Sequence, residues 1–202
     1  MKLATHLVAA AFAFCVCACD ADDKKETKPV NTKEASAKIE DLSKLSPEEL
    51  KKKLGDEAYY VCIMKGTEKP FQNKYWNNHE PGIYVDVISG KPLFASTHKF
   101  ESNSGWPSFF DPLDKNELKL ETDHKIGYPR TEIIAKTSGA HLGHLFDDGF
   151  DAKTQKPTPT GMRYCINSAA LKFVHKDKLK EAGLEKYQSL FDEKAAKPAE
   201  KK

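Results

Sequence analysis

The sequence lacks an excess of charge of either sign. Its 202 residues include 32 Lys and Arg against 30 Asp and Glu, which gives a formal net charge of +2. Binding to nucleic acid usually needs a surface field of one sign, so we expect no nucleic-acid partner. Apolar residues are also few, at 39% of the chain against 31% charged residues. This share predicts one compact domain with polar ends rather than two domains.

Cysteine is scarce, and three of the five cysteines lie in the first 19 residues. Residues 1–19, MKLATHLVAAAFAFCVCAC, join a short basic start to an apolar run that is too short for a membrane-spanning helix. We interpret them as an export signal. Their end resembles the lipobox of bacterial lipoproteins, which implies that Cys19, after the small Ala18, is lipidated and becomes the mature N-terminus. The alternative is an ordinary cleaved leader.

The rest of the chain divides by composition. Residues 20–44 are charged and nearly free of aromatic side chains, so we expect a flexible tether. Residues 45–174 are the predicted domain, and residues 175–202 are a short helix followed by a lysine-rich tail. Asp20 resembles a signal that retains some lipoproteins in the inner membrane. We therefore expect a lipid-anchored protein of the bacterial cell envelope that faces the periplasm.

Long helical patterns are missing between residues 58 and 174, where prolines and glycines separate short apolar runs. Ser46 followed by Pro47 is typical of the start of a short helix. The alternating or apolar runs predict an antiparallel β fold. The predicted strands are residues 59–64 (YYVCIM), 82–88, 92–96, 131–137 and 162–174.

Only Cys62 and Cys165 remain as thiols once the first 19 residues are processed. In an exported protein a structural disulfide between them is one interpretation. In a strand, however, Arg163, Cys165 and Asn167 share one face. A guanidinium beside a thiol stabilises the thiolate and lowers the thiol pKa, which would make Cys165 a nucleophile. A buried, inert Cys165 is the alternative.

Two further segments carry side chains suited to chemistry. The loop-like GAHLGHLFDDG holds His141 and His144 three residues apart, followed by two aspartates of which the second is Asp148. These residues offer proton donors and hydrogen-bond partners, although a surface histidine pair or an incomplete metal site would look the same. Trp106 lies between a glycine and a proline, so a rigid turn presents it either to the core or to a ligand.

The motifs KGTEKPF, SGWPSF, AHLGH, DG and RYCINSAAL, in this order, resemble the methionine sulfoxide reductase B family. The resemblance covers roughly residues 45–174, with one loop lengthened by FDAKTQKPTPT. It implies two antiparallel β-sheets with a few short helices, and reduction of the R epimer of methionine sulfoxide, free or in proteins. It also implies a monomer without a cofactor. Since the domain is exported, the electrons would come from a thioredoxin-like protein of the envelope.

The resemblance also implies roles for individual residues. Cys165 is the nucleophile and ends as a sulfenic acid. His144, with His141, holds the substrate oxygen and supplies protons, because a sulfoxide oxygen leaves only when it is protonated. Trp106 is the aromatic wall that receives the substrate methyl group. The polar residues that organise water and the thiolate are Arg163, Asn167 and Asp148.

The sequence departs from the family at a zinc site and at a resolving cysteine. Many members bind zinc through two CxxC pairs, whose positions here hold Asp86, Ser89, Ala135 and Ser138. We therefore expect no zinc. Ser104 stands where many members place the cysteine that attacks the sulfenic acid. We expect Cys62 to take this resolving role instead; the alternative is a buried Cys62, with Cys165 recycled directly by an external thiol.

Two other classes of function use parts of the same residue set. A cysteine hydrolase would use Cys165 with His144 as its base, and would also need an oxyanion hole. A non-catalytic lipoprotein that binds methionine would need Trp106 but no reactive Cys165. Incubation with methionine sulfoxide and dithiothreitol separates these classes, because only the reductase yields methionine.

Overall fold

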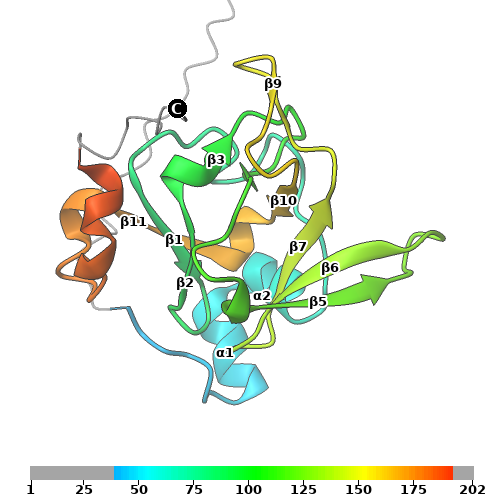
Figure 1. Ribbon diagram of the computed structural model, residues 1–202. Helices are drawn as coiled ribbons and strands as arrows, with labels where there is room; N and C mark the ends of the chain where they lie inside the picture. Colours follow the sequence, from blue (N-terminus) through cyan, green and yellow to red (C-terminus); the bar gives the residue numbers. More distant parts are fainter. Residues whose placement is uncertain (1–38, 193–202) are drawn as a thin grey trace, which may run out of the picture. The chain divides into compact units, whose positions relative to one another are not determined.

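The computed structural model describes residues 39–192 (Figure 1). The predicted signal, Cys19, most of the predicted tether and the lysine-rich tail lie outside the described residues. Leu42 is buried, and its amide donates a hydrogen bond to the Ile88 carbonyl at 2.7 Å. Contacts with the sheets therefore begin a few residues before Leu45. No helix in residues 39–192 is long and apolar enough to cross a membrane.

The described chain is mainly β, and all its strand pairs are antiparallel. A three-stranded sheet has the order β11-β1-β2, with β1 Gly82–Asp86, β2 Pro92–Ala95 and β11 Leu171–His175. A six-stranded sheet has the order β3-β4-β10-β7-β6-β5, with β3 Lys99–Phe100, β4 Ser108–Phe109, β5 Leu118–Asp123, β6 Arg130–Ala135, β7 His141–Phe146 and β10 Arg163–Ile166. The lengthened loop forms a small ribbon of β8 Phe150–Asp151 and β9 Lys156–Pro157. The predicted fold class is confirmed.

The helices are short. The two α-helices are α1 Pro47–Leu54 and α2 Asp56–Cys62, and the 3-10 helices are Ser96–His98, Lys115–Glu117, Ser168–Ala170, Lys176–Lys178 and Glu185–Phe191. Helix α1 begins as predicted, because the Ser46 hydroxyl accepts from the Glu49 amide while the Glu49 carboxylate accepts from the Ser46 amide at 3.1 Å. This reciprocal pair satisfies two backbone donors at the helix start. The predicted C-terminal helix is the 3-10 helix Glu185–Phe191.

The strand predicted at residues 59–64 is wrong, because residues 59–62 form the end of helix α2 and residues 63–64 form a turn. Two consecutive residues, Val61 and Cys62, are buried, whereas Tyr60 and Ile63 on either side are exposed. That pattern follows a helix face and not the alternation of a strand. A short apolar run does not distinguish the two by itself.

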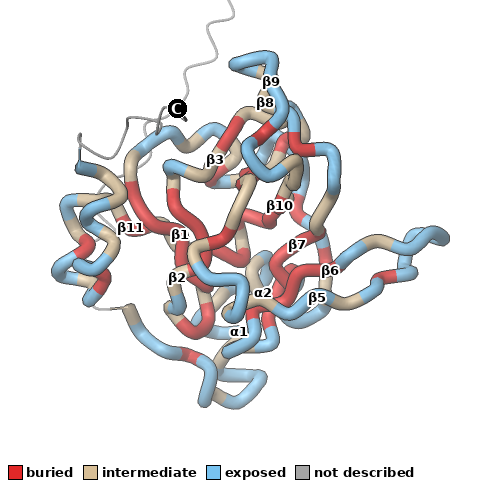
Figure 2. Tube along the Cα trace, viewed as in Figure 1, coloured by how far each residue is buried: buried red, intermediate tan, exposed pale blue. Residues whose placement is uncertain are grey.

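Two hydrophobic clusters lie on opposite faces of β1, which is buried along its whole length (Figure 2). Tyr84 belongs to the larger cluster, which includes the stacked rings of Phe94 and Phe109 at 4.5 Å and extends to helix α2. Ile83 and Val85 belong to the smaller cluster, which the C-terminal 3-10 helices cover (Figure 1). The three-stranded sheet is therefore a central layer, and the larger cluster supports the six-stranded sheet.

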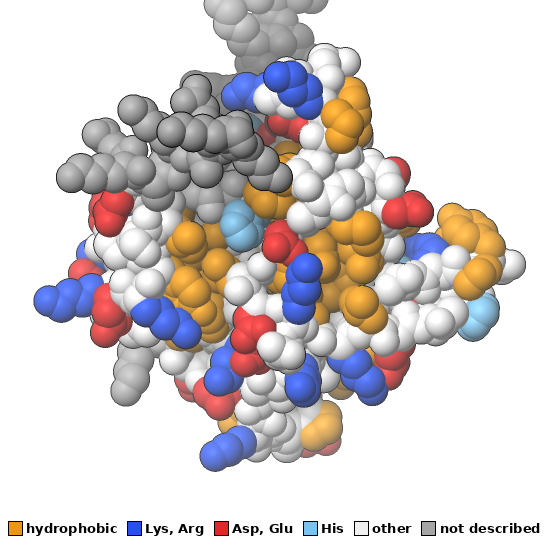
Figure 3. All heavy atoms as spheres, viewed as in Figure 1, with side chains coloured by type: hydrophobic (Ala, Val, Ile, Leu, Met, Phe, Trp, Pro, Cys, Tyr) orange, Lys and Arg blue, Asp and Glu red, His pale blue; other side chains and the backbone are white. Residues whose placement is uncertain are grey.

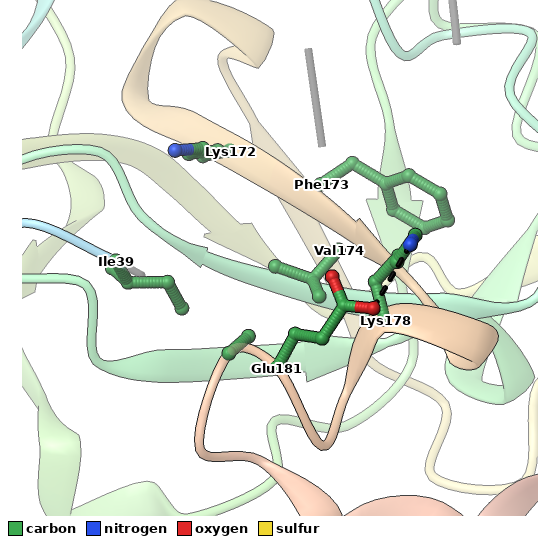
Figure 4. A pocket seen from close by; sticks show the side chains of 7 residues that line it. Ile39, Lys172, Phe173, Val174, Lys178 and Glu181 are labelled. Atoms are coloured by element: carbon green, nitrogen blue, oxygen red, sulfur yellow. Dashed lines mark hydrogen bonds and ion pairs between the residues drawn. The ribbon is translucent and has the colours of Figure 1, made fainter. Parts of the chain in front are cut away.

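A small cavity of about 10 Å³ lies beside the smaller cluster (Figure 4). Its lining includes Ile39 and Val174, and the ion pair of Lys178 and Glu181, at 2.9 Å, crosses its rim. It has room for about one water molecule and for no larger ligand. The hairpin of β5 and β6 projects at the opposite side of the fold (Figure 1), and its end exposes hydrophobic side chains, including Ile126 and Tyr128 (Figure 3).

Candidate active site

Cys165 lies in the middle of the six-stranded sheet. Strand β10 pairs with β4 and β7, and the register sets Cys165 opposite Ser108 on one side and His144 on the other. His144 is in turn opposite Glu132 on β6. Directly opposed residues of antiparallel strands point to the same face of a sheet. Four polar side chains from four strands therefore form one row across this face.

A bulge in β7 brings the two histidines together. His141 and His144 lie on a strand and not in a loop, and a spacing of three would point them to opposite faces. The pairing of β7 with β6 shifts its register between Ile133 and Ile134, which leaves Leu142 as an extra residue. The extra residue returns His141 to the face of His144, and the ring centroids are 5.4 Å apart.

The glycine of the AHLGH motif permits the close approach of β7 and β10. A Cβ atom at Gly143 would collide with the carbonyl oxygen of Cys165. Any larger residue would therefore push the strand that carries His144 away from Cys165. This is the physical reason for a glycine between the two histidines.

His141 is held by a buried carboxylate. Its Nδ1 lies 2.7 Å from Glu132 Oε1, and Lys65 Nζ donates to Glu132 Oε2 at 2.9 Å. Burial lowers the pKa of His141, although Glu132 acts in the opposite direction. The neutral ring therefore donates Nδ1–H to Glu132. Its Nε2 is buried without a hydrogen-bond partner in the described structure, so this nitrogen is left to accept a proton.

His144 is held in the same way from the neighbouring hairpin. Its Nε2 lies 2.8 Å from Asp123 Oδ2, which also accepts from Arg130 Nη2 at 2.7 Å. The backbone amide of Lys125, together with His144 and Arg130, holds the pKa of Asp123 well below its usual range against the effect of burial. Burial lowers the pKa of His144. Each histidine is thus bound to a carboxylate that a cation also contacts.

The sequence analysis missed both carboxylates. Asp123 closes the end of β5 and Glu132 lies on β6, and neither belongs to a motif that contains a histidine. Their roles follow from strand pairing across the hairpin, which the sequence alone does not define. The single usable signal was the strand predicted for TEIIAKT, because successive residues of a strand point to opposite faces and Glu132 then lies on the face opposite Ile133.

The thiol of Cys165 lies between a cation and hydroxyl groups. Arg163 donates two hydrogen bonds to Asp148, both at 2.8 Å, and its guanidinium lies 4.2 Å from the centre of the Phe146 ring. Burial raises the pKa of Cys165, and this outweighs the lowering by Arg163 and by the hydroxyl of Ser104. The expected effect of Arg163 is therefore present but smaller than the effect of burial, which leaves a protonated thiol at neutral pH.

Trp106 is fixed by the loop of the KGTEKPF motif. Its indole Nε1 donates to the Glu68 carbonyl at 3.2 Å, and the Glu68 amide donates to Asn167 Oδ1 at 3.2 Å. Asn167 Nδ2 donates to the Leu142 carbonyl at 3.0 Å. The Glu68 carboxylate accepts from the Ser168 amide, and burial raises its pKa to about 7. Asn167 therefore ties three segments of the site together through their backbones.

Cys62 has surroundings that differ from those of Cys165. It lies at the end of α2 in the larger hydrophobic cluster and is 2% exposed. Burial, followed by the nearby Asp86 and Glu68, raises the pKa of Cys62. Both cysteines are free thiols in the described structure. The predicted resolving thiol is thus in the core.

The four positions that correspond to zinc ligands do not fit a structural zinc. Asp86 accepts hydrogen bonds from the Ile88 amide at 3.1 Å and from the Ser89 amide at 3.2 Å, and it also accepts from the Ser89 hydroxyl. Ser138 accepts from the Ala140 amide at 3.2 Å, and Ala135 has no side-chain donor atom. Side-chain hydrogen bonds thus close two turns at the positions where thiolates would bind a metal.

A second hollow has a volume of about 310 Å³. Helix α2, Glu68, Asn73 and Ser168 contribute to its lining, which does not include Cys165 or either histidine. The hollow is therefore separate from the sheet face, where the free thiol of Cys165 lies beside carboxylate-bound histidines. This arrangement on an antiparallel β fold is typical of a thiol-dependent enzyme.

Comparison with known proteins agrees with this class of site. Residues 54–175 match the SelR domain, and the chain belongs to this family. A similar relative is "Peptide methionine sulfoxide reductase MsrA/MsrB" of Vibrio cholerae serotype O1 (strain ATCC 39315 / El Tor Inaba N16961), which is 42% identical over 162 residues. The match covers 80% of this chain and 41% of that relative, so the chain spans about two fifths of its length. The resemblance inferred from the motifs is confirmed at the level of the family.

Proposed function

We propose that this chain reduces the R epimer of methionine sulfoxide, free or in proteins, to methionine. The observation that carries the proposal is the row in which Cys165 lies directly beside His144. Membership of the SelR domain family and the name of the Vibrio cholerae relative support it. The cysteine hydrolase and the methionine-binding lipoprotein gain no specific support from the geometry.

The chemical step uses Cys165 as a two-electron reductant. Its sulfur attacks the sulfoxide sulfur and forms an S–S bond. The protonated oxygen then passes to the Cys165 sulfur as the S–O bond of the substrate and the new S–S bond break, which leaves a sulfenic acid at Cys165. The sulfoxide gains two electrons and leaves as methionine, while Cys165 loses two electrons. The thiol proton ends on the transferred oxygen, so atoms and charge balance without a further reactant.

The histidines move that proton. Because Cys165 is protonated at rest, the step begins with transfer of its proton to an unprotonated imidazole nitrogen. His141 offers its unpartnered Nε2, and Glu132 stabilises the imidazolium that forms. His144, bound through Nε2 to Asp123, has its Nδ1 left for the same purpose. The imidazolium then protonates the sulfoxide oxygen as it leaves.

Arg163 and Trp106 prepare the thiolate and the substrate. The guanidinium lowers the pKa of Cys165 and so stabilises the transient thiolate, while Asp148 and the Phe146 ring hold that guanidinium in place. Trp106 presents an aromatic surface to the substrate methyl group, and sulfur–aromatic contacts contribute about 0.3–1.5 kcal/mol.

Recycling needs a thiol that can reach the sulfenic acid. Resolution by Cys62 requires its Cα to come within about 7 Å of that of Cys165. Cys62 is buried in the core with a raised pKa, so the end of α2 would first have to leave the hydrophobic cluster. Direct attack by the dithiol of a thioredoxin-like protein on the half-buried Cys165 needs no such movement. The structure therefore favours direct recycling, which was the alternative to the predicted role of Cys62.

Turnover of Cys62→Ser with thioredoxin decides between the two routes. Direct recycling predicts turnover close to that of the unsubstituted protein. If the variant stops after one turnover with thioredoxin yet cycles with dithiothreitol, Cys62 is the resolving thiol.

The reductase proposal itself is tested by incubating the protein with each epimer of methionine sulfoxide and dithiothreitol. We expect methionine from the R epimer and none from the S epimer. Cys165→Ser should yield none from either. Hydrolysis of a thioester probe without any methionine would instead support the hydrolase.

We propose further that Cys19 carries a lipid and that the protein faces the periplasm, anchored in the cell envelope. The proposal rests on the sequence of residues 1–20. Labelling of cells with a palmitate analogue should mark the protein, and Cys19→Ala should lose the label and the membrane association. If the protein with Cys19 intact is cleaved and released from the membrane without the label, its leader is an ordinary signal peptide.

A further inference from the structure

Three serine hydroxyls gather beside Cys165. Ser102 Oγ lies 2.8 Å from Ser104 Oγ and 2.7 Å from Ser108 Oγ. Ser104 Oγ lies 3.8 Å from Cys165 Sγ, and Ser108 is directly opposite Cys165 in the ladder of β4 and β10. The turn with Asn103 and Gly105 at positive φ brings these hydroxyls together.

The amides of Ser104 and Trp106 donate to Ser102 Oγ at 3.3 Å and to Ser104 Oγ at 3.4 Å, but the hydroxyl protons themselves have few other acceptors. Ser108 is buried at 1% exposure, and the Trp106 carbonyl accepts weakly from Ser108 at 3.3 Å and from Ser104 at 3.4 Å. A hydroxyl carries one proton that rotates toward the best acceptor. The oxygen of a sulfenate on Cys165 Sγ would carry a negative charge, so it would be a stronger acceptor than this shared carbonyl.

We propose that Ser102, Ser104 and Ser108 form a hydroxyl pocket that binds the oxygen of a sulfenic acid at Cys165 and prolongs the life of this intermediate. The biological role of this pocket rests on the proposed reductase function, whereas the binding of the sulfenic acid oxygen does not. A hydroxyl cannot form a disulfide with the sulfenic acid, whereas it can donate a hydrogen bond to its oxygen. The pocket therefore protects the sulfenic acid until an external dithiol reduces it.

An external dithiol ends this protected state in two steps. One thiol of the external dithiol attacks the sulfur of the Cys165 sulfenic acid and releases water. The second thiol then attacks the mixed disulfide, which restores the Cys165 thiol and leaves the dithiol oxidised. A long-lived sulfenic acid suits this route, because the second protein must first diffuse to the site.

Ser102 is the residue to change, because its hydroxyl joins Ser104 and Ser108. The full chain is treated with one equivalent of hydrogen peroxide, which oxidises the thiol to a sulfenic acid and releases water. Dimedone is added at intervals, and the adduct on the peptide that contains Cys165 is measured by mass spectrometry. Ser138→Ala is the matched control, since Ser102 accepts from the Ser104 amide at 3.3 Å and Ser138 accepts from the Ala140 amide at 3.2 Å.

We expect Ser102→Ala to shorten the lifetime of the sulfenic acid at least threefold and to move the alkylation of Cys165 by iodoacetamide to higher pH. Ser102→Thr, which keeps the hydroxyl, should restore both. A lifetime and an alkylation profile equal to those of Ser138→Ala would overturn the proposal. If Ser102→Ala unfolds, the Ser102→Thr and Ser108→Thr proteins are compared, and a shortened lifetime in both folded variants would overturn it as well.

Peroxide generates the sulfenic acid without methionine sulfoxide. A protein that fails to reduce the sulfoxide but keeps a hydroxyl-dependent lifetime would contradict the proposed function alone. A protein that reduces the sulfoxide without this dependence would contradict the hydroxyl pocket alone.

Discussion

Replacement of Glu132 by Gln should slow the reaction by removing the charge that stabilises protonated His141. Glu132 contacts His141 at 2.7 Å and Lys65 at 2.9 Å, and it is 5% exposed. Glutamine keeps the shape and one acceptor oxygen, so the ring orientation survives while the negative charge is lost. A hydrogen bond to a charged group contributes about 1.5–3 kcal/mol, which corresponds to about 1–2 pKa units.

The pKa of His141 should therefore fall by about 1–2 units, and the rate of sulfoxide reduction in a single turnover should fall by about 10- to 100-fold. NMR titration of labelled histidine measures the first quantity, and rapid-quench assay of methionine measures the second. Glu117→Gln is the control, because Glu117 accepts a hydrogen bond from Thr137 on the same hairpin but contacts neither histidine. A Glu132→Gln protein with an unchanged His141 titration and an unchanged rate would refute the role assigned to this carboxylate.

Three other predictions concern acid–base chemistry, redox chemistry and stability. His144→Ala should lower turnover with dithiothreitol by about 100-fold or more, the usual contribution of a positioned acid or base; an activity loss below tenfold would contradict this. Ser104→Cys should give a disulfide with Cys165 after oxidation, because Ser104 Oγ already lies 3.8 Å from Cys165 Sγ. Peptide mapping without reduction would detect this disulfide, and two free thiols would contradict the prediction. Burial lowers the pKa of His141 and His144 in the folded protein, so the unfolded chain binds more protons near pH 6. The free energy of unfolding, measured in urea, should therefore fall as the pH drops below about 6.5.

The absence of the four zinc thiolates leads to one further prediction. The purified protein should keep its thermal unfolding midpoint in the presence of a strong chelator, because hydrogen bonds of Asp86 and Ser138 close the two turns. Stoichiometric zinc in elemental analysis, together with unfolding on chelation, would contradict this.

The sequence predicted five of the eleven strands in residues 39–192, those whose apolar runs are bounded by prolines and glycines. Strands β1, β2 and β10 lie within the predicted segments, β6 and β11 each extend one residue beyond them, and the start of α1 followed from Ser46 and Pro47. Residues 162–174, predicted as one strand, form β10 and β11 of two different sheets, with the 3-10 helix Ser168–Ala170 between them. Helix α2 was missed because YYVCIM is rich in β-branched and aromatic residues, yet it packs two adjacent residues into the core. Tertiary packing determined the secondary structure of that segment, and local propensity does not include tertiary packing.

The site residues also include some that the sequence predicted and some that it did not. Family motifs identified Cys165 and His144, and the ladder of β10 and β7 places them side by side. The bulge that turns His141 to the same face, and the carboxylates of Asp123 and Glu132, depend on the register of strands that are distant in sequence. The pKa of Cys165 is raised by burial, which is known only from the structure, whereas the sequence showed only the opposite effect of the nearby Arg163.

A single turnover without reductant tests the central claim most directly. The full chain is mixed with an excess of the R epimer of methionine sulfoxide, and both methionine and the oxidation state of the peptide containing Cys165 are measured. The account predicts one equivalent of methionine and one sulfenic acid, trapped by dimedone at Cys165, with Cys62 still a free thiol. Formation of methionine without oxidation of Cys165, or the same yield from Cys165→Ser, would contradict it.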